Sequence, residues 1–435
     1  MSNPHSQLLK RLRDKSATIG IVGLGYVGLP LLLRYSEAGF KVLGLDVDQS
    51  KVNHLNGGKS YIAQFGSDRV AQAREAGMEA TTDSVRISEA DAVIICVPTP
   101  LNKYREPDLR FVVDTTDQLA PHLRAGQVVS LESTTYPGTT AELLGPILEE
   151  ASGLGPGDFL LGYSPERIDP GNQTHTFVNT PKVTSGVDDA SLAVVDAFFG
   201  ALVDQTVPVG SPAEAELVKL LENTFRHVNI ALVNELAMFA RELGVDVWRA
   251  IDAASTKPFG YMRFTPGPGV GGHCLPIDPS YLAWRVKQHL GHTFRFVELA
   301  NDVNEHMPDY VHARVTALLN QQRKSLNGSK VLLLGLAYKR GTSDWRESPS
   351  VVVADRLAAS GAELEFCDPH IPEVNARSAR FPLVDFGPDT LGGADVVVVL
   401  VDHPEFDPAT IAEHSALVFD AKNIMRGTGF TGEIL

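Results

Sequence analysis

A short apolar stretch near the N-terminus runs directly into a glycine-rich turn, and this junction limits the possible folds more than any other feature. Residues 18–22 read TIGIV and are followed by GLGYVG, in which Gly23, Gly25 and Gly28 are spaced as GxGxxG. A helical segment comes next, and then a second apolar strand that ends at Asp46, 18 residues after Gly28. These are the parts that a dinucleotide-binding βαβ unit requires.

Each part of this unit has a physical role in holding NAD. Gly23 allows the tight turn, Gly25 lets the backbone approach a pyrophosphate, and Gly28 lets the helix pack on the sheet. The start of the helix favours phosphates, and Asp46 would accept hydrogen bonds from the adenosine ribose and repel the 2′-phosphate of NADP. A glycine-rich turn without a cofactor is the alternative. The residues predicted here to bind NAD are Gly23, Gly25, Tyr26, Val27, Gly28 and Asp46.

Strands alternate with helical sequence through the first half of the chain, and the same rhythm returns near the C-terminus. Apolar strands are expected at 92–97 and 127–131, and again at 330–335, 363–366, 395–401 and 416–419. Such alternation predicts parallel, doubly wound sheets. The second half has GLAYK in place of the glycine triplet, so it is expected to share the architecture and to bind differently.

A helical stretch separates the two halves. Ser211, Pro212 and Glu214 form a helix start, and Gly244 is a plausible stop. Apolar residues recur between them at helical spacing: Leu217, Leu220, Leu221, Phe225, Val228, Leu232, Leu236 and Phe239. A helix of about 30 residues is about 45 Å long, so we interpret it as a connector and a candidate dimer interface.

The sequence therefore predicts an α/β protein with two Rossmann-like doubly wound parallel-sheet domains joined by a long helical connector. The expected domains are an NAD-binding domain at 1–210, a central helical and dimerisation domain at 211–320, and a second Rossmann-like domain at 321–435. A chain of 435 residues is too long for one ordinary core, which agrees with this division.

Composition excludes several classes of function. The net charge of −15 argues against nucleic acid as a partner, although a small phosphorylated ligand needs only a few local cations. No stretch approaches the roughly 18 apolar residues of a membrane helix, and no secretory core stands at the N-terminus. Three widely spaced cysteines can form neither a disulfide framework nor a four-cysteine metal site. We expect a cytoplasmic protein with no membrane partner and no metal.

The densest glycine stretch leads to a cysteine. Residues 264–279 read FTPGPGVGGHCLPIDP, and such glycine density is typical of backbone that approaches a ligand. We interpret Cys274 as a nucleophile, because a thiol in a dehydrogenase can hold an aldehyde as a hemithioacetal until a second oxidation. Cys96 and Cys367 lie among apolar neighbours in strands and are expected to be buried. His273 is adjacent to the thiol and is expected to point away from it.

Further candidates lie at strand ends and on the connector. VPTP follows the third strand and STTYPG the fourth, so Thr99 and Thr134 stand where ligands bind in such sheets. Lys219 and Asn223 are four residues apart and share a face of the helix, where a solvated surface is the alternative to a site.

Together these residues resemble the UDP-glucose/GDP-mannose dehydrogenase family of sugar-nucleotide 6-dehydrogenases. The resemblance extends over about residues 18–423 and comprises IVGLGYVGLPL, VPTP, STTYPG, YSPERIDPGN, ELVKLLENTFR, GPGVGGHCLPIDP and GLAYKRGTSDWRESPS. TKPFG, the GPGxGGHC loop and SPER are most similar to the UDP-N-acetylglucosamine 6-dehydrogenase branch, which serves bacterial surface polysaccharides such as O-antigen. Ile277 stands where glucose-using members commonly have lysine. UDP-N-acetylmannosamine, UDP-glucose and GDP-mannose remain alternative substrates.

The resemblance implies a role for each residue around the thiol. Cys274 would attack the aldehyde and carry a thioester. Lys219 and Asn223 would steady the oxygen at C6, and Asp278 would position a water or assist proton transfer.

The resemblance also implies residues for hydrolysis and binding. Glu166 and Thr134 would order the hydrolytic water. Lys339 and Arg346 would meet the substrate diphosphate and the cofactor, and Arg263 would reach the sugar nucleotide of a neighbouring subunit. The residues expected at the substrate are Glu166, Arg167, Lys219, Asn223, Arg263, Gly271 and Lys339; Thr99, Thr134 and Arg346 are added at NAD.

The expected reaction is a double oxidation of a primary alcohol on a UDP-sugar, with two NADH formed, by a homodimer or higher homo-oligomer. A 3-hydroxyacid or 6-phosphogluconate type of dehydrogenase also joins a Rossmann domain to helices, but it needs neither the thiol nor a second nucleotide-binding lobe. A catalytically silent NAD-binding sensor would be expected to lose Cys274, Lys219 or Asp278, and all three are present.

Overall fold

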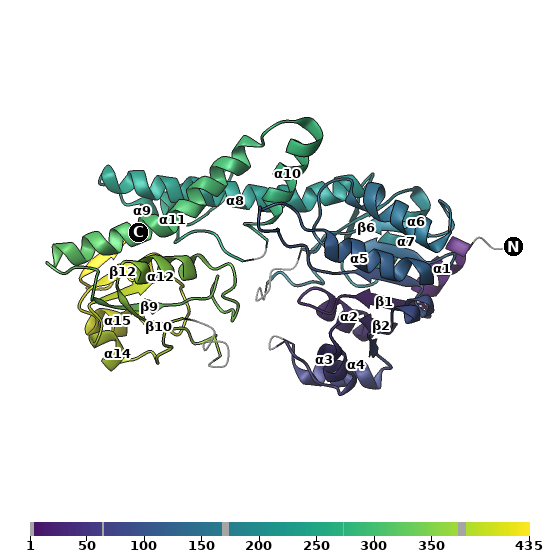
Figure 1. Ribbon diagram of the computed structural model, residues 1–435, viewed down its shortest axis with the longest axis horizontal. Coiled ribbons are helices and arrows are strands. Elements are labelled where there is room, and N and C mark those ends of the chain that lie inside the picture. Colours follow the sequence, from purple (N-terminus) through teal and green to yellow (C-terminus); the bar gives the residue numbers. More distant parts are fainter. Residues whose placement is uncertain (1–3, 63–64, 168–173, 273, 373–379) are drawn as a thin grey trace. The chain divides into compact units, whose positions relative to one another are not determined.

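The computed structural model describes residues 4–62, 65–167, 174–272, 274–372 and 380–435 (Figure 1). The chain divides into two compact units, the first made of Met1–Glu222 and Ser280–Gly291, the second of Asn223–Pro279 and His292–Leu435. Each unit contains one predominantly parallel sheet, which confirms the predicted fold class. None of the helices in these described ranges combines the length and the apolar character needed to cross a bilayer.

The first unit is built on an eight-stranded sheet. Its strands are β1 Thr18–Val22, β2 Lys41–Leu45, β3 Glu79–Thr81, β4 Ala92–Ile95, β5 Val128–Leu131, β6 Leu160–Tyr163, β7 Lys182–Gly186 and β8 Thr206–Pro208. They stand in the order β3-β2-β1-β4-β5-β6-β7-β8. All neighbours are parallel except β6 and β7, which are antiparallel. The first residue of β7 therefore lies at the edge where β4, β5 and β6 end.

Helices cover both faces of this sheet. They are α1 Pro4–Arg13, α2 Gly28–Glu37, α3 Gln49–Asn56, α4 Ser67–Glu75, α5 Arg110–Leu119, α6 Gly145–Ser152 and α7 Asp189–Gly200, with short turns η1 Ser84–Glu89, η2 Ala120–His122 and η3 Thr139–Leu144. Alternate residues of β4 enter opposite cores: Ile94 joins one apolar cluster, and Val93 and Ile95 join the other. A strand buried on both faces explains why the sequence reads as a continuous apolar run.

The second unit repeats the plan with five parallel strands in the order β10-β9-β11-β12-β13. These are β9 Lys330–Leu334, β10 Glu363–Cys367, β11 Val396–Val399, β12 Val418–Asp420 and β13 Gly432–Ile434. Their helices include α9 Val247–Ala254, α11 Arg295–Gln321, α12 Pro349–Ala359, α14 Pro388–Gly392 and α15 Pro408–His414, and α11 packs along α12 (Figure 1). Asp368 follows β10 as Asp46 follows β2, so the internal resemblance is structural.

The expected connector is α8, Pro212–Glu242, and α10 spans Asp278–Leu290. Glu214 N–H donates to Ser211 Oγ at 3.3 Å, as the predicted cap requires. Leu220 is buried, but most of the apolar stripe faces outward. We call these exposed residues the α8 seam: Leu217, Leu221, Phe225, Leu232, Leu236 and Phe239.

Candidate active site

The turn between β1 and α2 has the geometry of a pyrophosphate cradle. Gly23 has φ +89°, and a Cβ placed there would lie 2.7 Å from the carbonyl oxygen of Cys96. A Cβ on Gly28 would lie 1.9 Å from the carbonyl oxygen of Gly23, so only glycine lets α2 start so close to the strand. At Gly25 nothing lies within 4 Å of a Cβ position, which leaves backbone open to a ligand. The described residues therefore fit NAD.

Asp46 presents a fixed carboxylate beside this turn. Its Oδ2 accepts the N–H of Leu24 at 2.8 Å and lies 3.0 Å from Lys51 Nζ, while its Oδ1 accepts the N–H of Asp48 at 2.9 Å. Such an acceptor suits ribose hydroxyls and repels a 2′-phosphate. Of the other predicted NAD residues, Tyr26 is exposed and Thr99 is half-buried.

A second group of predicted residues lies in the first unit, near the ends of β5 and β6. Thr134 is half-buried in the loop after β5. Lys219, on α8, is buried, and its ammonium donates to the carbonyl oxygen of Glu166. Arg167 donates to the Glu222 carboxylate at 2.5 Å and to the carbonyl oxygen of Pro181 at 2.6 Å. These hydrogen bonds fix the position of the segment that contains Glu166.

Three predicted residues lie in the second unit around the start of α10. Asn223 and Asp278 are buried, and Asn223 Nδ2 donates to Asp278 Oδ2 at 2.5 Å. Cys274 is exposed, and its carbonyl oxygen accepts the N–H of Asp278 at 2.8 Å in the turn that leads into the helix. Cys96 and Cys367 are buried, as expected. The expectation for His273 falls outside the described residues.

The glycine loop before Cys274 is packed closely against its own unit. Gly267 N–H donates to Asn234 Oδ1 at 3.0 Å, and Gly272 N–H donates to the carbonyl oxygen of Glu347 at 3.3 Å. A Cβ on Gly271 would lie 2.6 Å from Pro349 Cδ, so the loop can follow this path only with glycine there. The loop is thereby joined to the GLAYKRGTSDWRES segment.

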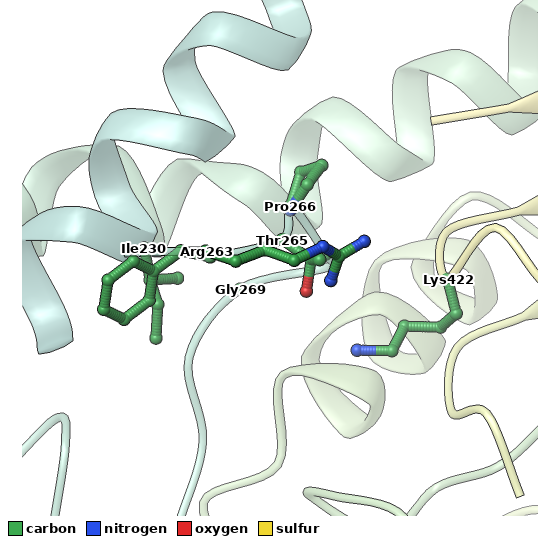
Figure 2. Close-up of a pocket in the computed structure, with 8 residues that line it drawn as sticks. Ile230, Arg263, Thr265, Pro266, Gly269 and Lys422 are labelled. Carbon is green, nitrogen blue, oxygen red and sulfur yellow. The ribbon is translucent and has the colours of Figure 1, made fainter. Parts of the chain in front are cut away.

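This loop lines a cavity of about 270 Å³ (Figure 2). Its lining residues are Ile230, Arg263, Phe264, Thr265, Pro266, Gly267, Gly269 and Lys422. Figure 2 shows the cationic ends of Arg263 and Lys422 directed toward the same space. Asp252 lies 3.0 Å from Arg263 and 2.6 Å from Arg426, so two arginines share one carboxylate. Lys422 adds a further positive charge to the lining, and the pocket therefore favours an anion.

Lys422 was not predicted as a site residue. It lies two residues after β12, at the carboxyl edge of the second sheet. Because ligands bind at this edge in such sheets, its position in the sequence could have identified it as a candidate. Lys339 is half-buried, with its ammonium 5.8 Å from the Tyr338 ring centre. Arg346 is exposed and makes two hydrogen bonds to Asp344, at 2.9 and 2.8 Å.

One group in the described residues has the composition of a metal site: His370, His403 and Glu405. Gly341 N–H donates to His403 Nδ1 at 3.2 Å, so Nδ1 carries no proton and the proton lies on Nε2. His403 Nε2 lies 3.3 Å from Asp368 Oδ2 and serves as its donor. Because both ring nitrogens are engaged, this geometry favours a buried hydrogen-bond network over a metal centre.

Three family models match the chain, all from the UDP-glucose/GDP-mannose dehydrogenase family. The NAD binding domain matches residues 17–203, the central domain 213–306 and the UDP binding domain 332–427. The chain is 33% identical to UDP-N-acetyl-D-mannosamine dehydrogenase of Pyrococcus horikoshii, over 94% of this chain and 96% of that protein. It is also 33% identical to UDP-N-acetyl-D-glucosamine 6-dehydrogenase of Pseudomonas aeruginosa, over 90% and 92%.

Solved structures agree. The UDP-D-ManNAc dehydrogenase of Pyrococcus horikoshii matches with a TM-score of 0.87 at 32% identity, over 96% of this chain and 98% of that one. A UDP-glucose dehydrogenase from Pyrobaculum islandicum matches with a TM-score of 0.87 at 28% identity, over 96% and 97%. Three domain matches in order, together with relatives covering nearly the whole chain, confirm the resemblance seen in the sequence. The chain belongs to the UDP-glucose/GDP-mannose dehydrogenase family of NAD-dependent nucleotide-sugar dehydrogenases.

Proposed function

We propose that this protein oxidises the C6 alcohol of UDP-N-acetylglucosamine to the carboxylate in two steps, through a thioester on Cys274. The observation that carries the covalent step is the exposed thiol at the end of a glycine loop, in the same unit as the buried Asn223–Asp278 pair. The acetamido sugar is supported by the TKPFG, GPGxGGHC and SPER motifs and by Ile277. UDP-N-acetylmannosamine is the second candidate, because relatives named for each sugar are 33% identical to this chain.

The proposed steps use groups suited to each charge that develops. NAD, when bound, supplies the hydride acceptor for both oxidations. The Cys274 thiolate adds to the aldehyde carbon, while Lys219 and Asn223 donate hydrogen bonds to the C6 oxygen. After the second oxidation leaves a thioester, water bonds to the acyl carbon and gives its proton to Glu166. The C–S bond then breaks with its electron pair on sulfur, which restores the thiolate.

The remaining predicted residues are assigned to positioning water and binding the two nucleotides. Thr134 and Asp278 would orient water or assist proton transfer. We assign the substrate diphosphate to Lys339 and to the cationic pocket of Arg263 and Lys422, because that pocket has more positive than negative groups. Arg346 is assigned to the cofactor.

The protein is proposed to be a homodimer, joined through the α8 seam. Six large apolar side chains are exposed along one face of a single helix, which is more than a monomer ordinarily leaves in water. All three cysteines are free thiols, which supports the cytoplasmic location expected from the sequence.

The test is the number of NADH molecules formed per sugar nucleotide, with UDP-N-acetylglucosamine, UDP-N-acetylmannosamine and UDP-glucose compared. We expect two NADH with UDP-N-acetylglucosamine and complete loss in Cys274→Ala. Cys367→Ala is the matched control, because that thiol is buried in the same unit, and it should keep activity. Two NADH only with another sugar would overturn the substrate, and one NADH, or activity without Cys274, would overturn the thioester.

A further inference from the structure

Lys182, the first residue of β7, is an almost completely buried lysine. Its side chain is 4% exposed, and lysines are rarely buried to this extent unless they are paired. The ammonium donates to Glu132 Oε1 and, at 2.9 Å, to the carbonyl oxygen of Pro165. It also lies 4.0 Å from Glu166 Oε2 and 4.8 Å from the ring centre of Phe199. One buried cation therefore faces two carboxylates.

The sheet topology brings these groups together. The antiparallel register pairs Gly162 with Gly186 and Tyr163 with Ser185, and its continuation by three residues pairs Glu166 with Lys182. Glu132 directly follows β5, the strand on the other side of β6. Because β7 runs against β6, its first residue lies at the edge where its neighbours end. The antiparallel strand thus places a lysine at the edge expected to carry ligands.

The charges around Glu166 come from several elements, and the Lys182 ammonium lies 4.0 Å from its carboxylate. Glu132, from the end of β5, is the primary partner of Lys182. Cys96, after β4, donates its thiol to Glu132 Oε2 at 3.7 Å. Lys219, from α8, donates to the backbone carbonyl of Glu166. Burial raises the pKa of Glu132, and the Lys182 ammonium opposes this rise.

A buried ion pair is a weak source of stability, because removing both charges from water costs about as much as their attraction returns. The energetic argument therefore points away from a purely structural role for Lys182 and Glu132. Their position beside Glu166 supplies a chemical one, since an ammonium 4.0 Å from a carboxylate oxygen attracts it and restricts where the side chain can point.

We propose that Lys182 is a positioning residue for Glu166: with Glu132 as its fixed counter-ion, its buried ammonium holds the Glu166 carboxylate in place to take the proton of the hydrolytic water. The inference rests on the proposed function, in which Glu166 acts in hydrolysis of the Cys274 thioester. Lys182 itself touches neither substrate nor thioester and acts only through Glu166. Both oxidations precede this step, so the loss of Lys182 should affect hydrolysis selectively.

The test is Lys182→Met in the full-length enzyme, followed by rapid mixing with NAD and the sugar nucleotide that it oxidises. We expect a burst of two NADH per site, then turnover at least about tenfold slower than in the wild type, with the acyl adduct on Cys274 visible by intact-protein mass spectrometry. Lys182→Arg should restore most of the rate.

A double variant separates this role from folding. Lys182→Met alone leaves Glu132 as a buried charge without its partner, which destabilises the fold. Lys182→Met with Glu132→Gln removes both charges, so it should melt near the wild-type temperature and still accumulate the adduct. Hydrolysis at the wild-type rate in the double variant, with no adduct on Cys274, would overturn the inference.

Glu166→Gln distinguishes a failure of this inference from a failure of the proposed function. If Glu166→Gln hydrolyses the thioester normally, the role proposed for Glu166 is wrong and Lys182 has no catalytic group to position. If Glu166→Gln accumulates the adduct and the double variant does not, only the role of Lys182 is wrong. Accumulation in both supports the two proposals together.

Discussion

Asp46 is the side chain that we expect to select the cofactor, and its hydrogen bonds fix its place beside the glycine turn. Backbone N–H groups of Leu24 and Asp48 hold its two oxygens, so the carboxylate cannot turn away from the glycine turn. A carboxylate fixed this way loses little freedom on binding ribose, and its charge opposes a 2′-phosphate at close range. We therefore expect the choice of cofactor to depend on a residue whose position the backbone dictates.

We expect Asp46→Asn to raise the KM for NAD by about 10- to 100-fold, since a charged hydrogen-bond acceptor contributes about 1.5–3 kcal/mol. Preference for NAD over NADP should fall as well, because the repelling charge is gone. The measurement is initial rate against each cofactor. Lys51→Met is the control: it removes the cation 3.0 Å from Asp46 and leaves the carboxylate, so its KM should stay within a few-fold of wild type. An unchanged KM in Asp46→Asn would contradict this role.

At the scale of elements, Glu216 joins the start of α8 to the loop after β5. Its carboxylate accepts the N–H of Gly138 at 2.6 Å, and the N–H and hydroxyl of Thr140 at 2.8 and 2.7 Å. Glu216 lies three residues before Lys219, and the loop it holds begins beside Thr134. The helix and the loop that carry these two site residues are therefore fixed to each other by one buried side chain.

Burial raises the pKa of Glu216 to about 7, above its value in the unfolded chain. The native state then binds more protons than the unfolded state between about pH 4.5 and pH 7, so this group's contribution is present at low pH and is lost as pH rises through 7. The free energy of unfolding of the wild type should therefore fall between pH 5 and pH 8. In Glu216→Gln we expect this fall to be smaller, by at most about 3 kcal/mol.

The measurement is the free energy of unfolding by urea at pH 5 and at pH 8, for the variant and for the wild type. The other titrating groups contribute equally to both proteins, so they cancel when the two pH differences are compared. Glu216→Gln should also lower the free energy of unfolding at pH 7 by about 1–3 kcal/mol. The NH₂ group of glutamine would replace a carboxylate oxygen that accepts a backbone N–H, and that hydrogen bond would be lost. Glu214→Gln, at an exposed position of the same helix, is the control and should leave the pH difference unchanged. A wild-type pH difference in Glu216→Gln would show that Glu216 does not titrate as described.

Structural elements that depend on neighbouring residues could be predicted from the sequence. Contacts between residues far apart in the sequence could not. The βαβ unit around Gly23, the cap at Ser211 and the buried Cys96 each follow from neighbouring residues. The pairing of Lys182 with Glu132 depends on a strand that reverses direction 50 residues later, which no local pattern reveals. Periodicity marked the stripe on α8, but it could not tell which face of that helix would point outward.

At the scale of the whole molecule, the two units contain similar parallel sheets, but the residues at the carboxyl ends of their strands differ. In the first unit the acid after the second strand is Asp46, which backbone N–H groups and Lys51 hold. In the second unit Asp368 accepts the N–H groups of Leu336 and Ala337, each at 2.9 Å, and also faces the buried ring of His403. That histidine engages one oxygen of Asp368 from within the fold, so the two corresponding acids have different surroundings.

The α8 seam also concerns the whole molecule, because we propose that its exposed side chains pack against a second copy of the chain. These side chains are 41–62% exposed, so burying the rest of each would contribute about 0.7–1.5 kcal/mol, and a symmetric dimer buries the set from both copies. Against an association cost of about 4–15 kcal/mol, this is enough to keep a dimer together. We therefore expect light scattering to give about 94 kDa, twice the chain's 47.0 kDa.

Leu236→Arg should reduce that mass to one chain, because an arginine at the seam would have to be desolvated opposite its own symmetry mate. Arg226→Glu, a charge reversal on the same helix away from the seam, is the control and should leave the dimer intact. A circular dichroism spectrum equal to wild type would show that Leu236→Arg still folds. A wild-type mass of one chain would rule out the dimer, and a dimer that survives the seam arginine would place the interface elsewhere. Either result would leave the six exposed apolar side chains of the seam to be explained by a different partner.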